Sequence, residues 1–299
     1  MQAPKTLLWF FAGLVATIFL IQIWLSSWGL SIVLGLSIYF ILTLIVGVYE
    51  LKKLALNSVP ENVRMVATQA AYFPELDTQR LEQYTEELKG LGFEQLREYS
   101  VTSSNGKEVP VFARVFVHPI EHCIAEVGQV FAPHIENAPL ACVIFTTFES
   151  PDENLRAKLS SSVPPIPNAQ NEMDVTQLDD SIWSFATSSR KLDPILWTLR
   201  HPRKLISTHP EESPGGLFKI HLAKRDEMAR TLGLEVSRDI TFETFEYRVA
   251  VSNARLERAL RRKNPFVFLY EWKMVAPKHH EWWGDYPRLA AKKTRKNVS

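Results

Sequence analysis

The chain has 299 residues and a net charge of +1 at pH 7, and 46% of its residues are hydrophobic. The near-neutral charge and the lack of any nucleic-acid-binding motif argue against nucleic acid as a partner. Cys123 and Cys142 are the two cysteines, and both lie in apolar stretches. They are typical of buried thiols in a reducing compartment and require no disulfide.

The N-terminal part carries two apolar segments, Leu7–Leu25 and Leu30–Tyr49, which contain no Asp, Glu, Lys, Arg or His. Each has about 20 residues, which at about 1.5 Å per residue crosses a hydrocarbon core of about 30 Å. A signal peptide also begins with a charge and an apolar run, but this run is too long and no small-residue cleavage site precedes a polar mature chain. The pattern therefore predicts a two-helix transmembrane hairpin.

The short break at 26–29 places both ends of the hairpin on one side of the membrane. Lys5, Lys52 and Lys53 flank that side while the break has no charge, so the positive-inside rule predicts a multi-pass protein of the inner (plasma) membrane with both termini cytoplasmic. Small residues such as Gly35 allow a second helix to approach closely. That helix belongs to the hairpin itself or to another membrane subunit.

A helix is predicted soon after the hairpin. Asp77 is a suitable N-cap, and the helix carries Leu81, Tyr84 and Leu88 at core spacing before it ends at Gly90. About 240 residues follow the hairpin in all, which is enough for one large domain or two small ones with a real core.

The next part of the chain has the pattern of an antiparallel β-meander. Strands are predicted at 93–102, 109–117, 120–130, 140–148 and 181–187, with a weaker one at 155–160. Asn105-Gly106 between the first two is typical of a tight hairpin turn. The almost unbroken apolar run at 140–148 indicates a central strand.

Three helices are predicted towards the C-terminus: 192–199, 217–232 before Gly233, and a long helix from an N-cap at Ser237 to Lys263. The second helix has a stripe of Leu217, Ile220, Lys224, Met228 and Leu232. In the long helix, residues 240–251 have the composition of a strand, but three-and-four spacing over several turns favours a helix.

These elements predict an α+β fold, in which an N-terminal two-helix transmembrane hairpin precedes a soluble domain with an antiparallel β-meander covered by helices. We expect three parts: the hairpin at 1–57, a cytoplasmic α+β domain at 58–264, and an aromatic and basic C-terminal segment at 265–299.

One cluster of titratable residues is a candidate metal site. His118, Glu121, His122 and Glu126 lie close together in the sequence, and Zn²⁺ prefers nitrogen, sulfur and carboxylate ligands. Pro119 interrupts the alternation that would put these side chains on one face, and a solvated turn explains the cluster equally simply. The sequence predicts no cofactor, and the cluster supports only an alternative function, a membrane-tethered metal-dependent hydrolase.

A second candidate is a basic and aromatic surface for the membrane or a partner. Arg248, Arg255 and Arg262 recur every seven residues and should share one face of the long helix, where each cation near an anionic leaflet contributes about 1 kcal/mol. The full candidate surface is Arg248, Arg255, Arg258, Arg262, Lys263, Trp282 and Trp283. A plain solvated helix face is the alternative.

No motif of nucleophilic, phosphate-binding or dinucleotide-binding enzymes occurs in the chain. The sequence therefore predicts a membrane-anchored, non-enzymatic accessory, assembly or regulatory protein whose cytoplasmic domain binds a protein partner or the membrane surface. The lipid bilayer and a protein, including another membrane subunit, are its expected partners, with anionic lipid as a further candidate.

Overall fold

The computed structural model describes Gly13 and residues 15–21, 28–58, 64–102, 108–131, 138–149 and 182–298. These fall into two compact units. The first comprises Met1–Asn57 and Asn264–Leu269, and the second comprises Ser58–Lys263 and Tyr270–Ser299.

The first unit contains one long apolar helix, α2 (Trp28–Ser58). Its Ile32–Leu56 stretch is long and apolar enough to cross a membrane, and only 11% of that apolar window is buried. Val33 and Phe40, for example, are 64% and 68% exposed. The helix continues past Tyr49 through the charged residues to Ser58. Its length and composition fit a membrane span, and they also fit a signal sequence near the N-terminus.

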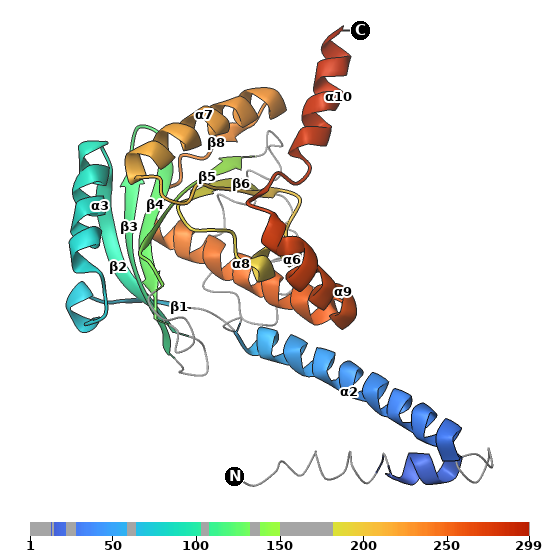
Figure 1. Ribbon diagram of the computed structural model, residues 1–299. Coiled ribbons are helices and arrows are strands. Elements are labelled where there is room, and N and C mark those ends of the chain that lie inside the picture. The colour runs from blue at the N-terminus through green and yellow to red at the C-terminus, as the bar shows by residue number, and fades with distance from the viewer. Residues whose placement is uncertain are drawn as a thin grey trace. The chain divides into compact units, whose positions relative to one another are not determined.

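Among the described residues one helix of this kind is present, so the structure does not show the second span of the predicted two-helix hairpin. The first predicted segment is described, as helix, only at Gly13 and 15–21, and Trp28 of the predicted break already belongs to α2. The two helical pieces do touch: Gly35 is buried, and a Cβ built on it would collide with the side chain of Ile18. Figure 1 shows the short dark-blue helix beside the first turns of α2.

The second unit is built on a nine-stranded sheet, and all of its strand pairs except one are antiparallel. The strand order is β1 (Arg64–Ala67), β2 (Glu94–Thr102), β3 (Glu108–His118), β4 (Cys123–Val130), β5 (Ala141–Glu149), β6 (Trp183–Ser188), β7 (Lys204–Thr208) and β9 (Glu281–Trp282), while β8 (Glu235–Val236) pairs with β5. The exception is β6 with β7, which is parallel.

The predicted α+β class and the antiparallel meander are confirmed, with β5 central as expected. β4 begins at Cys123 rather than at Ile120, because the chain turns there and His122 takes a positive φ of 50°. The Asn105-Gly106 turn and the weaker strand at 155–160 lie outside the described residues.

Helices cover both faces of the sheet. They are α3 (Thr78–Gly90), α6 (Pro194–Thr198), α7 (Pro214–Leu232), α8 (Phe242–Arg262) and α10 (Tyr286–Val298), with short helical turns at Ala70–Tyr72, Glu271–Val275 and Ala276–Lys278, and α9 (Pro265–Tyr270) belongs mainly to the first unit. Asp77 caps α3 as predicted: its carboxylate accepts from the backbone N–H of Arg80 at 3.0 Å. Gly233 ends α7 in the left-handed conformation, also as predicted.

Two helix details differ from prediction. α8 is a helix, as predicted, but its N-cap is Thr241 and not Ser237, which is buried and whose hydroxyl accepts from Arg248. The buried stripe of α7 runs through His221 and Arg225, whereas Lys224 is exposed. Sequence hydrophobicity missed this stripe because its two central members are polar.

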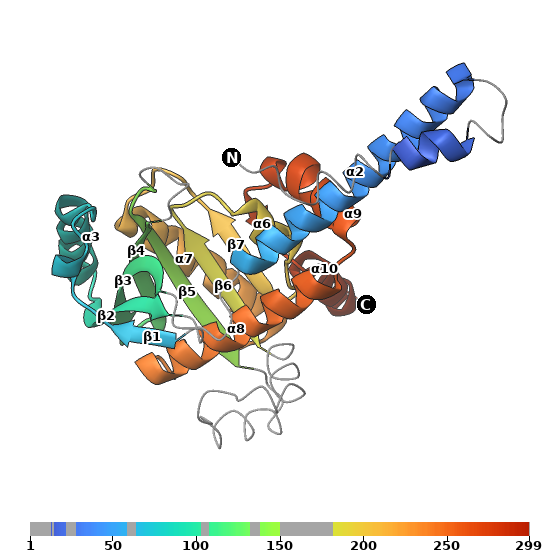
Figure 2. The same cartoon turned by 90° about the horizontal axis from the view of Figure 1, so that it is seen from below.

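Strand alternation divides the core into two layers. On one face α3 and α7 pack over side chains such as Phe112, Phe116 and Ile144. On the other face α8 packs over Tyr99 and Val115. Figures 1 and 2 show α7 and α8 on opposite faces of the sheet.

Truncation of Phe116 tests this core. Its ring is fully buried, so Phe116→Ala should lower the free energy of unfolding by about 3–5 kcal/mol through lost burial and a cavity. Urea unfolding of the detergent-solubilised chain, followed by tryptophan fluorescence, measures the change. Tyr72→Ala, at a side chain that is 71% exposed, is the control and should change stability by less than about 0.5 kcal/mol. Equal effects of the two substitutions would contradict the assigned core.

Candidate functional site

The predicted metal cluster is divided between the two faces of the sheet. His118 is buried on the α7 face, where its ring packs against Phe93 and Phe218. Its Nε2 lies 3.1 Å from the carbonyl oxygen of Leu91, and its Nδ1 accepts from the backbone N–H of Glu121 at 3.1 Å. Both nitrogens of this histidine are therefore engaged by the chain itself.

The two carboxylates of the cluster have separate partners, whereas the buried Nδ1 of His122 has no hydrogen-bond partner among the described residues. Glu121 forms an ion pair with Arg225 at 2.8 Å. Glu126 lies on the α8 face and accepts from the hydroxyl of Tyr99 at 2.7 Å. Burial raises the pKa of the Cys123 thiol to about 12, which disfavours a metal-binding thiolate. Among the described residues, no group of three or more His, Cys, Asp or Glu side chains is placed to hold a metal ion.

Much of the predicted basic surface is turned towards the protein. Arg248 reaches the hydroxyl of buried Ser237 and lines a pocket under α8. Arg255 donates to a backbone carbonyl at 3.0 Å, and Lys263 donates to the Glu271 carboxylate at 2.5 Å. These contacts hold α8 and the segment after it in place.

The other two basic residues of the predicted surface are Arg258 and Arg262. Arg262 is exposed, and Arg258 is half-buried with its Nε donating to the carbonyl oxygen of Ala254, one turn earlier in α8. The seven-residue spacing thus does not give a continuous exposed basic face.

The two predicted surface tryptophans are packed at the edge of the sheet. The Trp282 indole N–H donates to the carbonyl oxygen of His201 at 2.8 Å. The ring of Trp283 stacks on Phe185 with centroids 5.6 Å apart, and the Lys224 ammonium lies 5.1 Å from the Trp283 ring centroid. Both indoles therefore contribute to the fold as well as to the surface.

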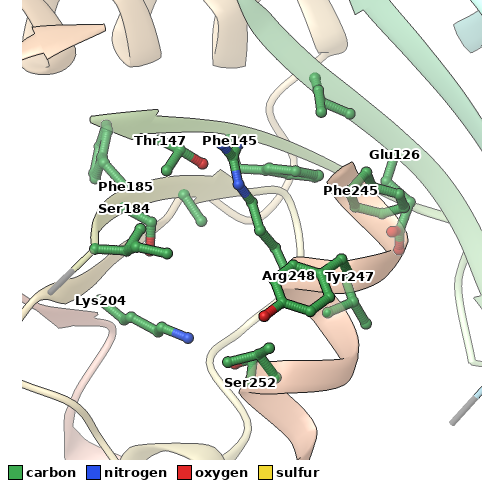
Figure 3. Close-up of a pocket in the computed structure, with 15 residues that line it drawn as sticks. Glu126, Phe145, Thr147, Ser184, Phe185, Lys204, Phe245, Tyr247, Arg248 and Ser252 are labelled. Atoms are coloured by element: carbon green, nitrogen blue, oxygen red, sulfur yellow. The ribbon is translucent and has the colours of Figure 1, made fainter. Parts of the chain in front are cut away.

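A cavity of about 230 Å³ lies between the sheet and α8, and it is the best candidate for a site. Its walls are mainly apolar, with Phe145 of β5 stacked on Phe245 of α8 at 5.2 Å between centroids. Polar side chains come from five elements and are shown with the aromatic ones in Figure 3: Glu126 of β4, Thr147 of β5, Ser184 of β6, Lys204 of β7, and Tyr247, Arg248 and Ser252 of α8.

Two charged groups of this pocket, Glu126 and Arg248, are half-buried, and partial loss of water shifts the pKa of each. Burial raises the pKa of Glu126, although the hydrogen bond from Tyr99 partly offsets the effect. Burial lowers the pKa of the Arg248 guanidinium, while the carboxylates of Asp239 and Glu149 act in the opposite direction. Apolar walls with a few polar groups of both charges are typical of a binding site for a small molecule.

Sequence reasoning named two of these residues for other roles. Glu126 was a candidate metal ligand and Arg248 a candidate surface residue. Lys204, Tyr247 and Ser252 carry no distinguishing signal in the sequence, because they meet at the cavity only where α8 packs on the sheet that contains β7.

The opposite face of the sheet holds polar groups that are satisfied internally. His221 is fully buried between the hydroxyls of Thr146 and Thr187, at 2.8 and 3.0 Å. At the N-terminus of α7 the anion position is filled by the Glu87 carboxylate, which accepts from the backbone N–H of Gly215 at 2.8 Å. These groups stabilise the fold and leave the α8 pocket as the better candidate.

Comparisons with protein-family models, with curated proteins and with solved structures found no match to this chain.

His221 gives a prediction about pH. Burial lowers its pKa from 6.5 to about 3, so between these values the unfolded chain binds a proton that the folded chain excludes. This contribution to stability is complete above pH 6.5 and is lost as the pH falls towards 3, with a slope of up to about 1.4 kcal/mol per pH unit. His221→Gln should remove that slope from urea-unfolding free energies measured between pH 6.5 and 4.5. His280→Gln, at an exposed side chain, is the control and should keep it. An unchanged slope in the first variant would refute the assignment.

Proposed function

We propose that this protein is a membrane-anchored, non-enzymatic accessory, assembly or regulatory protein whose cytoplasmic α+β unit binds a protein partner. The observation that carries the proposal is the exposed apolar surface of α2. Large side chains along its length, including Val33, Phe40 and Leu44, are each more than half exposed. Apolar surface of this extent requires lipid or another protein as its surroundings.

Membrane insertion of α2 is supported by its composition. Each Leu, Ile, Val or Phe near the centre of a span favours insertion by roughly 0.3–0.6 kcal/mol. The stretch from Ile32 to Tyr49 has no charged residue, and Glu50, Lys52 and Lys53 follow it directly. The part of α2 inside the membrane is therefore expected to end at these charged residues.

The anchor that we propose is the hairpin of Leu7–Leu25 and Leu30–Tyr49, with both termini cytoplasmic. The contact between Ile18 and buried Gly35 supports this arrangement, because a glycine lets two helices approach closely. Lys5 at the start and Lys52 at the end of the anchor favour the cytoplasmic side for both.

A binding role for the α+β unit is supported by the pocket under α8. Its groups suit recognition: a guanidinium at Arg248, hydroxyls at Ser184 and Ser252, and an aromatic wall at Phe145 and Phe245. Ligand pockets combine apolar walls with a small number of polar groups in this manner.

A topology experiment tests the anchor. We expect the full chain to remain in the membrane pellet after alkaline carbonate extraction and to leave it in detergent. Epitope tags before Met1 and after Ser299 should be protected from protease added outside intact spheroplasts, whereas a tag inserted after Ser27 should be cleaved. Loss of the N-terminal tag by processing would identify a signal sequence. Cleavage of the Ser299 tag from outside would overturn the cytoplasmic placement.

A second experiment tests the accessory role. After mild detergent solubilisation, the full chain should elute from a size-exclusion column with a partner in constant ratio. A control protein with Met1–Ser58 fused to an unrelated soluble domain separates partners of the α+β unit from proteins that adhere to the apolar helices. A monomeric full chain, or the same partners on the control, would contradict the proposal.

A further inference from the structure

We infer that the cavity between the sheet and α8 binds a small organic carboxylate with one aromatic or branched apolar group. The carboxylate pairs with Arg248, and the apolar group lies against Phe145 and Phe245. The inference names a ligand class for the proposed binding unit. It goes beyond the proposed binding of a protein partner and is independent both of that partner and of how the chain is anchored.

The volume of the cavity limits the size of the ligand. An apolar cavity of about 150 Å³ holds a benzene molecule, and pockets for drug-sized ligands have about 300–1,000 Å³. The cavity under α8, with about 230 Å³, lies between these values. It therefore fits one ring or one branched alkyl group together with a short acidic chain.

The position of Arg248 determines the charge of the ligand. Its two hydrogen bonds are long, at 3.4 Å to the carbonyl oxygen of Asp239 and 3.3 Å to the hydroxyl of Ser237. Charge-assisted bonds between a guanidinium and a carboxylate are usually about 2.7–2.9 Å, and a guanidinium has five N–H donors. Arg248 thus keeps donors for a carboxylate that would bind in two-point fashion.

Two buried arginines, Arg114 and Arg225, show what a fully paired guanidinium looks like in this protein, whereas Arg248 is half-buried. Arg114 contacts the carboxylates of Glu98 at 2.6 Å and Glu82 at 3.0 Å. Arg225 contacts those of Glu121 at 2.8 Å and Asp226 at 2.7 Å. Within the described residues Arg248 has no ion pair of this kind, since the carboxylates of Asp239 and Glu149 act on it only from a greater distance, and this difference points to a carboxylate supplied by a ligand.

The remaining charges of the pocket are compatible with an anion. Figure 3 shows the Lys204 side chain reaching into the pocket from β7, with Glu126 on the opposite side. Burial raises the pKa of Glu126, which favours its uncharged form and weakens its repulsion of a carboxylate. The hydroxyl of Tyr99 already donates to this carboxyl group at 2.7 Å, so a cationic ligand would have to compete for it.

The test uses the purified full chain in nanodiscs of zwitterionic lipid, with 4-fluorophenylacetate as the probe and fluorine NMR as the readout. We expect saturable binding of this acid, and at least tenfold weaker binding of 4-fluorophenylacetamide, which has the same shape and no charge. Dodecanoate should not displace the probe, because its chain exceeds the cavity. Equal affinity for acid and amide, absence of saturable binding, or displacement by dodecanoate would each overturn the inference. None of these results depends on topology or on a protein partner.

A matched pair of variants on α8 locates the contact. Arg248→Gln should weaken binding of 4-fluorophenylacetate at least tenfold, whereas Arg262→Gln, at an exposed position of the same helix, should leave it unchanged. Urea unfolding establishes that each variant is folded. Unchanged affinity in folded Arg248→Gln would refute the assignment. If that variant does not fold, the acid and amide compared on the unaltered chain decide the question.

Discussion

The alternation of side chains along the strands is the constraint on which the rest of this structure depends. Successive residues of a strand point to opposite faces of the sheet, and here helices cover both faces. The register of β3 with β4 pairs His118 with Cys123 and Val115 with Glu126. The histidine therefore faces α7 and the glutamate faces α8. A titratable cluster that is compact in the sequence is divided by the sheet, and each half acquires different neighbours.

Local signals were sufficient for much of the fold. The cap at Asp77 and the terminator at Gly233 depend on a few adjacent residues, and both were predicted correctly. Apolar patterns over a few residues likewise located β2 to β6. The cap of α8 was misplaced because Ser237 and Thr241 are equally suitable by residue type. In the structure the Ser237 hydroxyl accepts from Arg248 and from the backbone N–H of Asp239, and α8 begins only at Phe242.

The candidate site could not be predicted to the same extent, because its residues meet only through the order of the strands. Lys204 and Glu126 are far apart in the sequence and enter the pocket from β7 and β4. Arg248 was a candidate because it is spaced seven residues from the next arginine. Such spacing predicts that the arginines share one face of a helix, but it does not show whether that face is exposed. The α7 stripe shows the same limit, since a buried His221 cannot be distinguished from a solvated one without its two threonine partners.

The two faces of the sheet differ in how closely their polar side chains are paired within the chain. Under α3 and α7, Arg114 and His221 have short contacts to partners within the chain, as expected where an unpaired polar group would cost several kcal/mol. Under α8, Glu126 also has a short contact, from the Tyr99 hydroxyl at 2.7 Å, but the hydrogen bonds of half-buried Arg248 to described residues are long, at 3.4 and 3.3 Å.

The contrast between the units is as sharp. Phe116 in the second unit is fully buried by its own chain, whereas Phe40 in α2 is 68% exposed. The same side chain cannot favour both surroundings in water. The second unit therefore buries its apolar side chains within its own fold. The apolar side chains of α2 are left for an apolar environment or another helix to cover.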